Sequence, residues 1–144
     1  VHSDLNALST LHFAVEVLKV SHVVVCGHYG CSGVRATLRG DRHGLVDNWL
    51  RHVADVREKH RARLAGLGAA DEYRRLCELN VVEQVRNVAS STVVRDAWAR
   101  GQALTLHGWI YGLADGLLHD LGVTGAGEAD LADAYAAAVE APGG

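Results

Sequence analysis

The chain has 144 residues, of which 49% are hydrophobic and 22% are charged, and its formal net charge is -3 with nine histidines counted as neutral. This length supports one domain with a hydrophobic core, and the composition is that of a globular protein. The sequence has no long basic run that would point to nucleic acid, and no apolar run near the roughly 20 residues of a membrane-spanning helix. We therefore expect neither nucleic acid nor a membrane as a partner.

Hydrophobic periodicity and turn residues predict the secondary structure in chain order. The expected elements are a helix capped by Ser3 or Asp4 that runs through Leu18, a buried parallel strand over residues 21–26, a glycine-rich loop over 27–33, a helix that begins within 34–38, a helical stretch over 46–64, a long helix that includes 76–88, a helix capped by Ser90 or Ser91, a strand over 103–110, an edge strand over 117–123 and a last helix from 127 that stops near Pro142. Helices that alternate with short apolar strands predict one α/β domain over residues 1–144, with a mainly parallel β-sheet flanked by helices.

The cysteines and the first residues bear on the compartment and on completeness. The three cysteines are Cys26, Cys31 and Cys77, and a small odd number is typical of a reducing compartment. We therefore expect free thiols and a cytoplasmic protein. The sequence contains no methionine and starts at Val1, so we expect the natural protein to be longer than these residues.

A His-x-x-Cys pair, His28 and Cys31, directly follows the first predicted strand. Imidazole nitrogen and thiolate sulfur are common zinc ligands, and they must converge to about 2.0–2.3 Å from the ion. A three-residue step in a loop that opens a helix allows this, because Gly30 and Gly33 let the backbone turn closely. Two ligands do not complete a zinc site, so the pair alone also fits a half-buried cysteine beside a loop histidine.

Other residues of chemical interest are expected to have structural roles. Cys26 and Cys77 lie in apolar segments, which predicts core positions. The side chains of His107, Trp109 and Tyr111 share one strand face, which predicts a packed interior or a subunit interface. Three histidines lie among arginines in a polar stretch and are expected on a solvated face: His43, His52 and His60.

Several separated blocks of the sequence, in the same order, resemble the β-class carbonic anhydrases. The blocks are Phe13–Leu18, His22–Val34, Gly44–Leu50, Leu76–Val81 with Gln84, Val85 and Asn87, and His107–Gly112. The resemblance runs from about Val1 to Val123. It implies a zinc enzyme (cofactor Zn²⁺) that reversibly hydrates carbon dioxide to bicarbonate and a proton, assembled as a homodimer or a multiple of dimers.

The resemblance also implies a ligand set. In the family, zinc is held by two cysteines and one histidine, and His28 and Cys31 match the histidine and the second cysteine. The first cysteine of the family's site belongs to a Cys-x-Asp-x-Arg motif. In this sequence no such motif begins at Cys26 or at Cys77. That motif, with its catalytic Asp–Arg pair, is expected upstream of Val1. Because the family places its strand beside residues 22–26, we expect an unpaired strand edge at that position.

Two further residues are implied for the substrate cleft. Phe13 stands where the family often has an aromatic residue at the cleft, although a core position fits it as well. Gly33 is expected to offer a backbone N–H near the substrate. Two other functions stay open: a metal-free remnant that serves as an oligomerisation or interaction module, and a hydrolase of carbonyl sulfide or carbon disulfide with the same fold.

Overall fold

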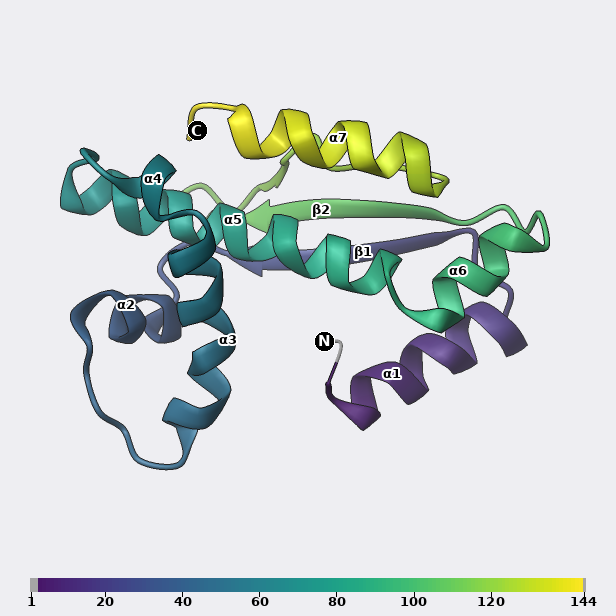
Figure 1. Ribbon diagram of the computed structural model, residues 1–144, viewed down its shortest axis with the longest axis horizontal. Coiled ribbons are helices and arrows are strands. Elements are labelled where there is room, and N and C mark those ends of the chain that lie inside the picture. The colour runs from purple at the N-terminus through teal and green to yellow at the C-terminus, as the bar shows by residue number, and fades with distance from the viewer. Residues whose placement is uncertain (1–2, 144) are drawn as a thin grey trace.

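The computed structural model of the chain describes residues 3–143. Its elements in chain order are α1 (Leu5–His12), a π-helical turn η1 (Phe13–Val17), β1 (His22–His28), α2 (Ser32–Arg39), α3 (Val46–Lys59), α4 (Arg61–Leu64), α5 (Ala69–Ala89), α6 (Thr92–Ala99), β2 (Thr105–Tyr111), β3 (Leu118–Asp120) and α7 (Glu128–Glu140). Figure 1 shows α5 lying across the sheet and α7 running alongside it, with α1 and α2 in separate parts of the molecule.

Local capping explains where the helices begin. The Asp4 side chain accepts a hydrogen bond from the Ala7 N–H at 2.8 Å, so Asp4 rather than Ser3 caps α1. Ser91 rather than Ser90 caps α6, because its side chain accepts from the Val94 N–H. The expected helix through Leu18 is divided, since α1 passes into η1 at Phe13.

The sheet has the order β1-β2-β3 and is mixed. β1 and β2 are parallel, with His22 opposite Thr105 and His28 opposite Tyr111. β3 is antiparallel to β2 and forms an edge, as the sequence predicts. Among the described residues β1 pairs with β2 alone, so the unpaired edge expected along this strand is also present.

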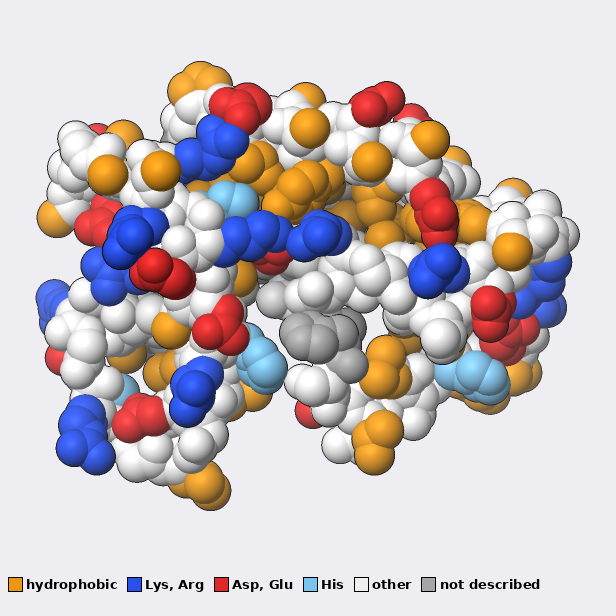
Figure 2. Space-filling view, in the orientation of Figure 1, with side chains coloured by type: hydrophobic (Ala, Val, Ile, Leu, Met, Phe, Trp, Pro, Cys, Tyr) orange, Lys and Arg blue, Asp and Glu red, His pale blue; other side chains and the backbone are white. Residues whose placement is uncertain are grey.

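Helix α5 forms the centre of the hydrophobic core. Its side chains Leu76, Leu79, Val82 and Val85 are almost completely buried. The helix contacts both β1 and β2, and it contacts α7 on another side. Figure 2 shows hydrophobic side chains between α7 and the Lys and Arg side chains that lie below it. The expected α/β architecture is thus confirmed, with α5 as its central helix.

The opposite face of the sheet is open in the part of the chain that the structure describes. Along β1 the residues alternate between exposed and half-buried positions, and Cys26 is exposed. The predictions of a buried strand and of a core position for Cys26 are therefore wrong. The reason is that residues i and i+2 of a strand share a face, and here one face of the parallel pair is uncovered. Cys77, by contrast, is buried on α5 as expected.

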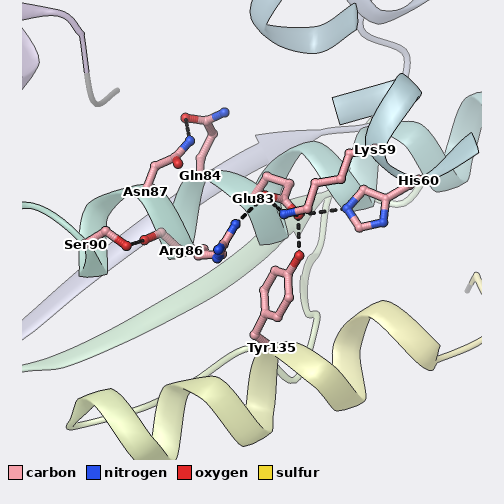
Figure 3. Close-up of polar contacts among 8 residues, drawn as sticks. All are labelled: Lys59, His60, Glu83, Gln84, Arg86, Asn87, Ser90 and Tyr135. Carbon is pink, nitrogen blue, oxygen red and sulfur yellow. Dashed lines mark hydrogen bonds and ion pairs between the residues drawn. The ribbon is translucent and has the colours of Figure 1, made fainter. Parts of the chain in front are cut away.

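A buried carboxylate joins three helices around Glu83 (Figure 3). Glu83 accepts hydrogen bonds from His60 Nε2 at 2.7 Å, from Lys59 Nζ at 2.8 Å and from the Tyr135 hydroxyl. His60 is only 4% exposed, so its predicted place on a solvated face is wrong. These bonds connect the end of α3 and the middle of α7 to α5. Burial alone would raise the pKa of Glu83, but the bonds from Lys59, Tyr135 and His60 outweigh it and lower that pKa.

Replacement of Glu83 by Gln is expected to reduce the free energy of unfolding by about 2 kcal/mol, because the buried His60 and the exposed Lys59 ammonium lose the carboxylate that accepts their hydrogen bonds. The folded-state pKa of Glu83 lies below the ordinary value of 4.5. The stabilisation by this carboxylate is therefore complete above that ordinary value and is lost as the pH falls through the folded-state pKa. Urea unfolding of wild type and variant at neutral and acidic pH measures both effects.

The matched control is Arg61→Gln, which breaks the exposed ion pair with Glu58. This change is expected to alter the free energy of unfolding by less than about 1 kcal/mol. Equal losses in the two variants, or a Glu83→Gln effect that does not shrink in acid, would contradict a stabilising role for the buried carboxylate.

Candidate metal centre

His28 is the last residue of β1, and its exposed side chain lies on the open face of the sheet. Its Nδ1 atom donates a hydrogen bond to the backbone carbonyl of Tyr29 at 2.8 Å. Since a carbonyl can only accept, this bond fixes the proton on Nδ1 and leaves the lone pair of Nε2 free. A metal-binding histidine is commonly held in this way, through its second nitrogen.

Cys31 lies three residues further on, immediately before α2. Gly30 has φ of 73°, a left-handed conformation that a glycine adopts without strain. The turn brings Cys31 to the N-terminal end of α2, where it is half-buried. The positive end of the helix dipole favours an anionic ligand such as a thiolate at this position.

The structure separates the two predicted cleft residues. A Cβ atom added to Gly33 would lie 3.8 Å from the Cys31 sulfur and 2.9 Å from Leu50 Cδ2, so Gly33 adjoins the candidate ligand. Phe13 lies in η1, which packs with α6, and is 54% exposed. The core alternative for Phe13 is therefore wrong, whereas its role at a substrate cleft stays a prediction.

Helix α5 holds the turn that carries the two candidate ligands. The Tyr73 hydroxyl donates to the Cys31 carbonyl at 2.9 Å, and the Tyr29 hydroxyl donates to the Glu78 carboxylate at 2.7 Å. Burial raises the pKa of Cys77 to about 11, against the effect of a hydrogen bond from the Cys31 backbone. The sequence alone predicts no role for Tyr29, Tyr73 or Glu78, and its only signal is the position of Tyr29 between the two candidate ligands.

The two donors suit zinc in kind, because imidazole and thiolate are its preferred ligands. They are too few for a complete site, which needs three protein ligands and an open position, or four ligands. Within residues 3–143, no group of three or more His, Cys, Asp or Glu side chains is arranged to hold a metal ion. The described chain therefore presents a pair of donors and no complete centre.

Comparison with known proteins identifies the family. A family model described as carbonic anhydrase matches residues 1–118. A β-carbonic anhydrase of Coccomyxa, solved in complex with acetazolamide, matches this fold with a TM-score of 0.86 and 40% sequence identity. The chain belongs to the β-class carbonic anhydrases. The resemblance predicted from separated sequence blocks is thereby confirmed.

The relatives extend beyond the matched region. The carbonic anhydrase of Emericella nidulans is 40% identical over 121 residues, which cover 83% of this chain and 53% of that protein. The Coccomyxa structure is covered to 60%, and this chain is covered to 92%. A structure of tetrameric β-carbonic anhydrases from Sordaria macrospora matches with TM-score 0.80 and 30% identity, covering 88% of this chain and 64% of that one. The chain thus spans about half of the curated relative and under two thirds of these structures.

Among residues 3–143, no helix has the length and apolar character needed to cross a membrane.

Alkylation of the cysteines tests the placement of the open face. Cys26 is exposed, whereas Cys77 is buried with its pKa raised to about 11. In the folded chain we expect iodoacetamide to modify Cys26 at least about tenfold faster than Cys77, since the exposed thiolate is the reactive species. Mass spectrometry of the peptides gives both rates. Equal rates in the folded chain would contradict the open face, and equal rates in urea provide the unfolded control.

Proposed function

We propose that the protein to which this chain belongs is a zinc-dependent carbonic anhydrase, which converts carbon dioxide and water reversibly to bicarbonate and a proton. The observation that carries the proposal is the His28–Cys31 pair on a turn held by α5, in a chain of the β-carbonic anhydrase family. The names of the relatives, which are carbonic anhydrases, support the same reaction.

His28 Nε2 and the Cys31 thiolate are the proposed zinc ligands of this chain. We propose that the remaining ligand, a second cysteine, and the Asp–Arg pair come from polypeptide outside the 144 residues. Two observations support this division. The described residues bring together no third donor, and the chain covers only 53% of the Emericella nidulans protein.

Each residue of the pair has a defined part in the proposed reaction. A bound zinc ion supplies the Lewis acidity that makes a water molecule nucleophilic near neutral pH. The Nδ1 proton of His28 is engaged in the hydrogen bond to the Tyr29 carbonyl, and this bond orients the imidazole ring. His28 is therefore a metal ligand in the proposed reaction and does not carry protons. The thiolate of Cys31 would add negative charge at the ion, and Gly33, whose Cβ would lie 3.8 Å from that sulfur, is proposed to offer its backbone N–H near the substrate.

Assembly and compartment form a second part of the proposal. We propose a homodimer or a multiple of dimers, because the open sheet face and the unpaired β1 edge are surfaces that a folded protein normally covers. The tetramers from Sordaria macrospora are consistent with that. Because Cys26, Cys31 and Cys77 are all free thiols, we further propose a reducing compartment such as the cytoplasm.

The specific alternative is a metal-free interaction module. The lack of a third donor among the described residues favours this alternative, and zinc content separates it from the enzyme. In the longer natural protein, the enzyme predicts one tightly bound zinc ion per subunit and turnover of carbon dioxide. The module predicts neither of these.

Substitution of the two ligands tests the proposal directly. In the natural protein, His28→Ala and Cys31→Ser are each expected to reduce zinc affinity and carbon dioxide hydration by more than about 100-fold. Loss of a hydrogen bond that supports a ligand lowers metal affinity by about 10–100-fold, and loss of the ligand itself is expected to lower it further. Cys26→Ser is the matched control and is expected to retain both properties. Zinc analysis and stopped-flow hydration measure the outcome, and a Cys31→Ser protein that keeps its zinc would contradict the assignment.

A further inference from the structure

The C-terminal helix α7 lies outside the region that the family model matches, residues 1–118. We propose that α7 positions the metal-ligand turn, residues 28–31, through a relay of three side chains: Arg75, Glu78 and Tyr29. Arg75 and Glu78 are positioning residues in this proposal, since neither touches the substrate. This proposal rests on the proposed function only in treating residues 28–31 as the metal-ligand turn. The hydrogen bonds of the relay do not depend on that function.

The first link joins α7 to α5. Arg75, which is only 7% exposed, donates from Nη2 to the carbonyls of Ala138 and Val139, both at 2.9 Å. These carbonyls belong to the last turn of α7, where helix carbonyls have no partner within the helix. The planar guanidinium can serve several acceptors at once in a fixed geometry. Arg75 therefore binds the end of α7 to α5.

The second link crosses a buried carboxylate. Arg75 Nη1 donates to Glu78 Oε2 at 2.9 Å, and the Tyr29 hydroxyl donates to Glu78 Oε1 at 2.7 Å. Glu78 is 1% exposed, so both oxygens depend on these protein partners. The Glu78 carboxylate thus joins the Tyr29 hydroxyl to the Arg75 guanidinium.

The third link reaches the metal ligands through one residue. Tyr29 lies between His28 and Cys31, and its carbonyl accepts the bond from His28 Nδ1 at 2.8 Å. Its backbone N–H donates to the Tyr111 carbonyl at 3.0 Å. A shift of Tyr29 would therefore move the acceptor that orients the His28 ring.

Side-chain packing beside the metal-ligand turn is incomplete, so the position of the Tyr29 ring depends on its hydrogen bond to Glu78. A cavity of about 610 Å³ is lined by Tyr29, Gly30, Arg75, Glu78, Ala138 and Pro142, among others. The Arg74 guanidinium covers the Tyr29 ring at 4.4 Å from its centroid. Since dense contacts do not fill this space, the relay and the cation–π contact fix the position of the ring.

Hydrogen exchange of the 144-residue chain tests the relay without any metal. In Arg75→Lys a single ammonium group cannot serve Glu78 and both carbonyls, so we expect the amides of residues 28–31 to exchange at least about fivefold faster. Tyr29→Phe interrupts the relay at its other end and is expected to act similarly. The double variant is expected to exchange no faster than the faster single variant, because both changes break one chain of contacts.

The matched control is Arg95→Lys, which alters the exposed ion pair with Glu128 at the start of α7. It is expected to leave exchange of the turn unchanged. Unchanged exchange of the turn in Arg75→Lys would overturn the relay. So would a double variant in which the accelerations of the two single variants multiply. Exchange that rises equally throughout α6 and β2 would also overturn it, because the effect would then be general destabilisation.

A second pair of variants tests the part played by α7. Ala137→Gly and Ala132→Gly are the same change at two exposed positions of this helix. Glycine weakens a helix locally. Only Ala137 adjoins the carbonyls that Arg75 binds, so Ala137→Gly is expected to accelerate exchange of the turn and Ala132→Gly is not. Equal exchange in both variants would overturn the role of α7.

Cobalt(II) provides a readout that separates the relay from the proposed function. In the longer natural protein, the thiolate–cobalt absorption band, which Cys31→Ser is expected to weaken, is expected to form with at least about fivefold weaker affinity in Arg75→Lys. Unchanged affinity in that variant would overturn the effect of the relay on the metal ligands. A natural protein without the band would instead count against the metal site, while the exchange data would still decide the relay.

Discussion

The close contact between α5 and the parallel strands determines most of the structure. A Cβ atom on Gly27 would lie 2.4 Å from Val81 Cγ2, and one on Gly108 would lie 3.0 Å from Val85 Cγ2. Two glycines therefore allow the helix to approach both strands closely. The same helix carries Glu78 to the metal-ligand turn and Glu83 to α3 and α7. Core packing and the geometry of the candidate site are thus set by one helix.

The two faces of the sheet differ in a way that bears on the whole protein. One face is covered by α5, and the other presents His22, His107 and Trp109, with the two histidine rings joined by a 3.0 Å hydrogen bond. Parallel strands are normally buried on both faces. The candidate ligand His28 lies on this open face, next to the unpaired edge of β1. The further zinc ligands that we propose, and a cover for this face, would therefore lie on the same side of the sheet.

The sequence predicts what depends on neighbours along the chain. Helix periodicity and the apolar run of the first strand are local, and they correspond to observed helices and to β1, which extends two residues beyond the predicted 21–26 and ends at His28. The predictions for Cys26 and His60 are wrong because their surroundings are not local. Alternation along β1 does not indicate which face has a cover, and the partner of His60 is Glu83, 23 residues away. The hydrogen bond between Tyr29 and Glu78 joins residues 49 positions apart, and no sequence pattern predicts it.

In the function that we propose, His28 and Cys31 coordinate a zinc ion whose third protein ligand lies outside these 144 residues. A crystal structure of the longer natural protein, with data collected at the zinc absorption edge, tests this most directly. We expect one anomalous peak per subunit, about 2.0 Å from His28 Nε2 and about 2.3 Å from Cys31 Sγ. A zinc peak bound by other residues, or zinc-loaded crystals with no peak beside this pair, would contradict it.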